Sequence, residues 1–193
     1  MNSIIIKRKE FEIIEILKDN IFKCSFKNKF YIFYKFDTSS INYKEDLLML
    51  TKLFRSNVSQ PKLQFVDKKQ GYVVREWLDG VTVFDYILDN DFNENIYKQI
   101  FYNSYSARVA GINLDFNLKS WMLVGNKLYY TKLFCEKYNP NLDFTKEAMR
   151  KWFLCEDLRK YYENNGVLSD KTRIKEEYAA NKEMVLMTCK YYI

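Results

Sequence analysis

The first third of the chain alternates apolar runs with polar breaks, a pattern typical of β-strands. Residues 11–17 (FEIIEIL) are rich in β-branched side chains, residues 21–26 follow after a polar break, and residues 30–36 (FYIFYKF) are strongly aromatic. Asn28 and Lys29 supply a turn between the second and third runs. We therefore predict a three-stranded meander at the start of the chain.

One helix and two more strands are predicted next. Residues 43–54 (YKEDLLMLTKLF) carry apolar side chains at helical spacing. Residues 63–66 and 71–76 are short apolar runs on either side of a polar turn, which predicts two further strands. The N-terminal part of the chain is therefore predicted to be a sheet with one helix.

After Gly80 the pattern becomes mainly helical. Helices are predicted over residues 81–88, 93–110 and 145–153, with Gly111 as the left-handed cap of the second, and a hairpin over residues 121–131 turns at Gly125 and Asn126. A last helix places five residues on one stripe, which we interpret as core packing: Ile174, Tyr178, Val185, Cys189 and Tyr192.

Composition excludes several kinds of chemistry. The 193 residues suit one domain or two tightly packed lobes, and the absence of histidine excludes Ser-His-Asp and Cys-His nucleophiles and histidine metal sites. The four cysteines are far apart and without a C-x-x-C spacing, so we expect small core residues in a reduced, cytoplasmic protein. We find no signal peptide and no apolar stretch long enough to span a membrane, and expect no membrane partner.

The charge is moderately basic, with 31 Lys and Arg against 25 Asp and Glu, a net charge of +6. This balance permits an RNA or DNA partner, since lysines can follow a phosphate backbone and aromatic rings can stack on bases. The lysines form no long block, however, and most Tyr and Phe residues lie at core spacing. A basic nucleic-acid-binding module is therefore a second alternative rather than the main hypothesis.

Three stretches together suggest a family. Residues 11–36 provide three strands, residues 72–80 (YVVREWLDG) are similar to a strand that runs into a hinge, and residues 111–132 (GINLDFNLKSWMLVGNKLYYTK) are similar to a catalytic loop followed by a hairpin. In this order and spacing, residues 9–134 resemble the protein-kinase-like superfamily. In size the chain is closest to small atypical kinases, such as the KEOPS-complex kinase and the lipopolysaccharide kinases.

The resemblance implies an α+β, two-lobed kinase-like fold, with a β-rich N-lobe over residues 1–78 and a small helical C-lobe over residues 79–193. In the N-lobe, Lys35 stands where a kinase has its strand-three lysine, and either Glu45 or Asp46 would be its partner. Glu76 would lie in the hinge. Arg75 would then line the back of the adenine pocket, or point outward if the register is off by one.

In the implied C-lobe, Asp115 matches the aspartate that accepts the proton of the substrate hydroxyl. The two positions that bind Mg²⁺ in kinases hold Ser120 and Lys132, and an ammonium repels a metal ion. We therefore predict no metal-binding residues, and the use of Mg²⁺ is left open. The loop over residues 18–23 (KDNIFK) contains no glycine to approach phosphates and is predicted to be an ordinary hairpin turn.

These substitutions favour a pseudokinase that acts by binding, with a protein as its partner and at most a weak ATP site near Lys35 and Lys132. The first alternative is a divergent ATP-dependent phosphotransferase. It would use Asp115 as base, Lys35 on the phosphates and an unplaced acidic residue such as Glu136 as metal ligand.

Overall fold

The computed structural model describes residues 3–90, 92–154, 157, 160, 161, 164, 165 and 177–191. Contacts divide the chain into two compact units, and the division falls inside helix α1 (Tyr43–Arg55). Unit 1 comprises Met1–Leu48 and Pro61–Asp79, and unit 2 comprises Met49–Gln60 and Gly80–Ile193. Unit 1 is mainly sheet and unit 2 is mainly helical, so the predicted α+β class is confirmed.

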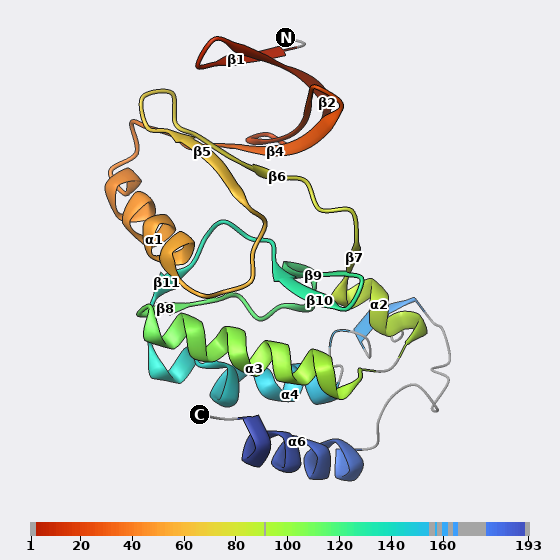
Figure 1. Cartoon of the computed structure of the whole chain (residues 1–193). Coiled ribbons are helices and arrows are strands. Elements are labelled where there is room, and N and C mark those ends of the chain that lie inside the picture. The colour runs from red at the N-terminus through yellow and green to blue at the C-terminus, as the bar shows by residue number, and fades with distance from the viewer. Residues whose placement is uncertain are drawn as a thin grey trace. The chain divides into compact units, whose positions relative to one another are not determined.

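Unit 1 is built on a six-stranded, fully antiparallel sheet in the order β1-β2-β3-β4-β6-β5. The sheet curls strongly at its β1–β2 end (Figure 1). Its strands are β1 (Ser3–Ile6), β2 (Lys9–Lys18), β3 (Ile21–Phe26), β4 (Lys29–Lys35), β5 (Leu63–Asp67) and β6 (Tyr72–Glu76). The predicted meander and the two later strands are therefore present, and α1 lies between β4 and β5 in the chain.

Two tight turns differ from the sequence prediction. Strand β1 was not predicted, because the hairpin that joins it to β2 turns at Lys7 and Arg8, which have positive φ values of 48° and 64° without being usual turn residues. The turn between β3 and β4 is centred on Lys27 and Asn28, also with positive φ, and not on Asn28 and Lys29. Both turns have the backbone that two-residue hairpins favour.

An aromatic cluster fills the inner face of the curled sheet. The ring of Phe11 lies 4.9 Å from both Phe26 and Phe33, 5.7 Å from Tyr31 and 6.0 Å from Phe65, measured between ring centres. Phe11 and Phe33 are buried. These contacts explain the high aromatic content of the first strands as packing.

Unit 2 contains the longest helix of the described chain, α3 (Glu94–Val109), and the hairpin of β9 (Trp121–Val124) and β10 (Lys127–Tyr130). Asn93 caps α3 by accepting a hydrogen bond from the backbone N–H of Ile96, and Gly111 follows with φ 69°. The other elements are β7 (Val81–Thr82), α2 (Val83–Asp89), β8 (Ile112–Asn113), η1 (Leu118–Ser120), β11 (Glu136–Lys137), η2 (Pro140–Leu142), η3 (Phe144–Ala148), α4 (Met149–Leu154) and α6 (Glu177–Tyr191).

Polar side chains of α3 hold the β9–β10 hairpin in place. Gln99 accepts a hydrogen bond from the N–H of Leu128 and donates to the carbonyl of Asn126, both at 2.8 Å. Asn103 is buried, donates to the carbonyl of Gln99 and accepts from the N–H of Ser59. The hairpin is therefore fixed on α3. Because the segment after β10 continues from this hairpin, its starting point is fixed as well.

Two helix predictions need correction. Residues 81–88 begin with the short strand β7, which pairs with β9, before α2 starts at Val83. Residues 145–153 are divided between a π-helical turn and α4. Within the described residues, no helix is long and apolar enough to cross a membrane.

The predicted stripe of the last helix is wrong where it can be checked. Val185 and Cys189 are exposed, whereas Met184, Met187 and Tyr191 pack against the core of unit 2. Ile174 and Tyr192 lie outside the described residues. Tyr178 belongs to α6, but the burial of its side chain is not described.

The described cysteines differ in their burial. Cys24 is buried, and burial raises the pKa of its thiol to about 12. Cys135 is half-buried with a thiol pKa raised by burial to about 11, and Cys189 is exposed. A core role is therefore confirmed for Cys24 and wrong for Cys189, while Cys155 lies outside the described residues.

Candidate functional site

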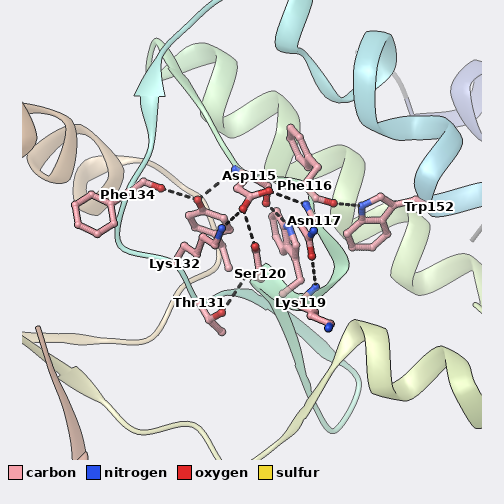
Figure 2. Close-up of polar contacts among 11 residues, drawn as sticks. Asp115, Phe116, Asn117, Lys119, Ser120, Thr131, Lys132, Phe134 and Trp152 are labelled. Carbon is pink, nitrogen blue, oxygen red and sulfur yellow. Dashed lines mark hydrogen bonds and ion pairs between the residues drawn. The ribbon is translucent and has the colours of Figure 1, made fainter. Parts of the chain in front are cut away.

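Asp115 lies in a tight loop between β8 and η1 in unit 2. Its Oδ1 accepts a hydrogen bond from the backbone N–H of Asn117 at 2.8 Å (Figure 2). The side chain of Asn117 in turn accepts from the N–H of Lys119 at 2.9 Å and so caps η1. Side chains that bond to the backbone two residues later are typical of tight loops. These two contacts fix the direction of the Asp115 carboxylate.

The other carboxylate oxygen of Asp115 is bound by two side chains. Lys132 forms an ion pair with Oδ2, and the buried Ser120 donates its hydroxyl to the same oxygen at 2.9 Å. The side chains of Asp115 and Lys132 keep 35% and 52% of their surface exposed. Ser120 and Lys132, which stand where the sequence resemblance would place metal ligands, therefore both bind Asp115.

These contacts shift the ionisation of Asp115. Burial opposes its charged form, but the hydrogen bonds from Lys132, the Asn117 N–H and Ser120, with the charge of Lys132, outweigh that effect and lower the pKa of Asp115. A carboxylate with a lowered pKa holds a proton less readily. Asp115 is therefore a poorer general base than an unpaired carboxylate would be.

Tyr130 ties the Asp115 loop to the chain that follows β10. Its buried hydroxyl accepts a hydrogen bond from the N–H of Asp115 at 3.2 Å and donates to the carbonyl of Phe134 at 2.7 Å. Thr131 donates from its N–H and its hydroxyl to the carbonyl of Ser120, at 2.9 and 3.0 Å. Lys132 therefore sits in a segment held on both sides of it.

Two tryptophans support the same loop from the core. Trp121 donates its indole N–H to the carbonyl of Asp115 at 2.9 Å, and Trp152 donates to the carbonyl of Phe116 at 2.7 Å. Both tryptophans are fully buried. Because the loop's carbonyls bind large buried side chains, moving the loop would disrupt the core of unit 2.

Tyr130, Thr131, Trp121 and Trp152 were not among the predicted site residues. One signal was present: in the predicted hairpin, Leu128 and Tyr130 alternate with Tyr129, and a buried tyrosine hydroxyl needs a hydrogen-bond partner. The partners themselves are set by the tertiary fold and have no sequence pattern.

A cavity of about 480 Å³ opens beside Asp115 in unit 2. Its charged lining residues are Asp115, Lys132, Glu136 and Lys151, and the ring of Phe134 also lines it. Glu136, the acidic residue of the alternative hypothesis, is thus on the wall of the same cavity as Asp115. Among the described residues, no three His, Cys, Asp or Glu side chains are grouped closely enough to hold a metal ion.

Asn113, which the sequence resemblance aligns with a position where kinases have histidine or another polar residue, makes hydrogen bonds to two backbone groups. Its amide donates to the carbonyl of Leu142 at 3.0 Å and its oxygen accepts from the N–H of Asn139. It is buried and lies opposite Glu136 in the β8–β11 pair. Asn113 therefore ties β8 to the segment around η2 beside the cavity.

In unit 1, Lys35 lies at the end of β4, directly opposite Tyr72 of β6, with its ammonium 5.6 Å from the centre of that ring. Directly paired residues, and residues two apart on one strand, share a face of the sheet, so Phe33 is on this face as well. The next residue, Phe36, contacts Tyr43 in the first turn of α1. Lys35 therefore lies on the face with the aromatic cluster.

The acidic partners expected for Lys35 are both in the first turn of α1. Glu45 is exposed and Asp46 is half-buried. Within the described residues, neither forms an ion pair with Lys35. The kinase-type roles of these three residues remain predictions.

The residues that the resemblance places at the hinge have clear local contacts. Glu76 accepts a hydrogen bond from the N–H of Lys62 at 2.8 Å, and its own N–H donates to the carbonyl of Lys62. Arg75 is buried, donates to the hydroxyl of Tyr34 at 2.9 Å and stacks over that ring. The alternative that Arg75 points outward is therefore wrong.

The predicted hairpin at residues 18–23 is confirmed, since Lys18 pairs directly with Ile21.

Comparison with known proteins gives no further guide: no protein-family model matches the chain, and no curated protein matches it.

Replacing Lys132 by methionine tests the electrostatics of the site. The variant removes the ion pair, so the pKa of Asp115 is expected to rise. Burial raises this pKa, and without Lys132 fewer contacts remain that lower it. At pH values above the ordinary carboxyl pKa, the ionised Asp115 stabilises the folded wild-type protein. This contribution is lost as the pH falls through the lowered pKa that Asp115 has in the folded state. The titration of the Asp115 carboxyl carbon, followed by NMR, measures the shift.

Lys119→Met is the matched control, since this lysine lies in η1, directly after the Asp115 loop, with its ammonium over the ring of Phe84. It should leave the Asp115 titration unchanged. Identical titrations in the wild type and in Lys132→Met would contradict the role given to the ion pair.

Proposed function

We propose that this chain is a degenerate protein-kinase-like protein that acts by binding a protein partner and not by phosphoryl transfer. The observation that carries the proposal is the ion pair between Asp115 and Lys132. Kinases need a free carboxylate beside the substrate hydroxyl and Mg²⁺ ligands at two further positions. Here the corresponding carboxylate is bonded to the residues at both of those positions.

The chain order of the elements supports the kinase-like part of the proposal. A meander of β2, β3 and β4 is followed by α1, then by β5 and β6, and the sheet order brings β6 between β4 and β5. Helix α3, the Asp115 loop and the β9–β10 hairpin follow in the order that the sequence resemblance requires.

The chemistry of the site supports the loss of activity. An ammonium at the position of a metal-binding carboxylate repels Mg²⁺, although it can supply part of the same positive charge. The charge of Lys132 is already used by Asp115. A nucleotide phosphate would have to compete with Asp115 for this ammonium, so any ATP binding is expected to be weak and independent of Mg²⁺.

One observation favours the alternative, a divergent ATP-dependent phosphotransferase. Glu136 lines the cavity beside Asp115, where a replacement metal ligand would be needed. Such an enzyme would lose ATP turnover on Asp115→Asn, because the base would be gone. Measurable turnover in the wild type that Asp115→Asn abolishes would therefore replace our proposal, whereas equal background rates in both proteins would support it.

Restoring the kinase residue types tests the proposal directly. In the double variant Ser120→Asn with Lys132→Asp, two oxygen ligands replace a hydroxyl and an ammonium, so Mg²⁺ should strengthen ATP binding by tenfold or more, measured by calorimetry. Ser120→Asn alone keeps the ammonium and should show no such gain.

Because Ser120 is buried, each variant is first checked by its unfolding transition. Where the double variant does not fold, Lys132→Asp alone, at an exposed position, takes its place. A folded variant with no Mg²⁺-dependent binding would count against the alignment of residues 115–132 with the kinase catalytic loop.

A further inference from the structure

Two hairpin turns of unit 1 carry a dense group of cations. Residues 7–9 (KRK) lie at the turn between β1 and β2, residues 27–29 (KNK) lie at the turn between β3 and β4, and all six residues are exposed. Strands β2 and β3 are antiparallel, with Glu12 paired to Ser25, so both turns lie at the same end of the sheet. They are separated by two strand spacings, about 10 Å. We call residues 7–9 and 27–29 the basic tips.

The backbone of the basic tips makes these side chains unusual. Lys7, Arg8, Lys27 and Asn28 all have positive φ values, between 48° and 64°. Asparagine and glycine are the usual residues in two-residue turns with this backbone, because other residues adopt it with strain. Lysine and arginine at three of the four positions are therefore not explained by the turn. They indicate that the positive charge itself has a role.

Aromatic rings orient the ammonium groups of the tips. The ammoniums of Lys9 and Lys27 lie 5.7 and 5.6 Å from the centre of the same ring, that of Phe26. The ammonium of Lys7 lies 5.7 Å from the centre of the Phe65 ring. A cation over a ring face is attracted to it but keeps its charge. The three ammoniums are therefore positioned without being neutralised.

Carboxylates are also present at this end of the sheet. Glu10 and Glu12 follow the first tip on β2, and Glu12 accepts a hydrogen bond from the hydroxyl of Ser25 at 3.3 Å. Glu76 ends β6 and accepts from the N–H of Lys62. In the part of the chain that the structure describes, none of these three carboxylates forms an ion pair with a tip cation. The charge of the tips therefore stays available to an anion.

An exposed aromatic pair adjoins the second tip. Phe30 directly follows Lys29 and keeps 48% of its surface exposed, and the N–H of the half-buried Trp77 donates to the carbonyl of Phe30 at 3.2 Å. The ammonium of Lys23 lies 5.0 Å from the centre of the Phe30 ring and 4.3 Å from that of Trp77. Glu15 is paired opposite Lys23 but, among the described residues, forms no ion pair with it. Aromatic rings beside cations are typical of surfaces on which nucleic-acid bases stack.

This chemistry decides between possible occupants. A membrane surface is disfavoured, because neither tip carries an apolar side chain that could enter it. Two copies of the chain are disfavoured as well, since basic tips repel each other. An acidic peptide matches the charge but leaves the exposed ring of Phe30 unused. A single-stranded nucleic acid matches both features, with regularly spaced phosphates for the cations and flat bases for the ring.

We propose that unit 1 binds single-stranded nucleic acid along the basic tips and the aromatic pair of Phe30 and Trp77. The phosphates would contact the cations of residues 7–9 and 27–29, and a base would stack on the ring of Phe30. Binding would tolerate most sequences, because cations contact only the backbone and every base has a face that can stack. All of these residues belong to unit 1, so the outcome of the ATP experiments does not bear on the proposal.

Removing charge from the tips tests the proposal. The triple variant Lys7→Asn, Arg8→Gly and Lys27→Asn loses three cations but keeps residue types that suit these turns, so it should unfold no more readily than the wild type. Its affinity for a fluorescent 20-nucleotide oligouridine, measured by polarisation, should fall tenfold or more at low salt. The slope of log affinity against log salt should become shallower by about 2, since fewer counterions are released.

The matched control removes three lysines from the opposite end of the same sheet. Lys18 ends β2, and Lys68 and Lys69 lie in the turn between β5 and β6, all three exposed. The variant Lys18→Asn, Lys68→Asn and Lys69→Asn changes the net charge by the same amount as the triple variant of the tips. It should bind oligouridine within about twofold of the wild type.

A second variant tests the stacking part of the proposal. Phe30→Leu keeps an apolar side chain at an exposed position but removes the aromatic face. The affinity for oligouridine should fall about fivefold or more, with an unchanged salt slope. Binding of inorganic polyphosphate, which has charges but no bases, should be the same in Phe30→Leu and in the wild type.

Four results would overturn the proposal. The first is a wild-type protein that does not bind oligouridine at low salt. The second is an equal loss of binding in the tip variant and the control variant, which would mean a response to net charge alone. The third is oligouridine binding that Phe30→Leu leaves unchanged, which would mean a general polyanion surface. The fourth is binding to phosphatidylserine vesicles that the tip variant abolishes while oligouridine binding persists.

Discussion

The half-buried carboxylate of Asp115 is held between two segments of the chain, and each of its oxygens has a partner. One oxygen binds the backbone of Asn117, and the other binds Ser120 and Lys132. Removing a partner from a buried carboxylate leaves its desolvation uncompensated, which typically costs more than a neutral hydrogen bond contributes. The loop before η1 and the segment after β10 are therefore coupled through one charge. Tyr130 and the buried tryptophans then hold both segments against the core.

This constraint links the local chemistry to the proposed function. An ion pair that stabilises the loop also lowers the pKa of Asp115 and uses the charge of Lys132, so the same contact that orders the site reduces its capacity to accept a proton or a phosphate. Kinase activation needs a segment after the catalytic loop that can change position. In this chain the segment that follows β10 is tied by Tyr130, Thr131 and Lys132. These contacts are what supports the proposed role in binding rather than in catalysis.

The sequence predicted the elements whose pattern is local and unambiguous. Strands β2 to β4 and helix α3 follow from apolar periodicity with a cap or a break at each end. Lys132 was singled out only through the family resemblance, which did not predict its ion pair with Asp115. The side of α6 that packs could not be predicted, because Val185 and Met184 are both apolar and lie on different sides of the helix. Strand β1 was missed because Lys7 and Arg8 have no turn preference. The ion pair itself depends on how the hairpin rests on α3, which no short pattern encodes.

The most direct test of the central claim is calorimetric titration of the wild-type protein with ATP in the presence and absence of Mg²⁺. If Lys132 takes the place of the metal and is neutralised by Asp115, Mg²⁺ should not strengthen ATP binding, and binding should be weak or absent in both titrations. Binding in the micromolar range that requires Mg²⁺ would contradict the account, because it would mean that other residues, with Glu136 the first to examine, complete a working metal site.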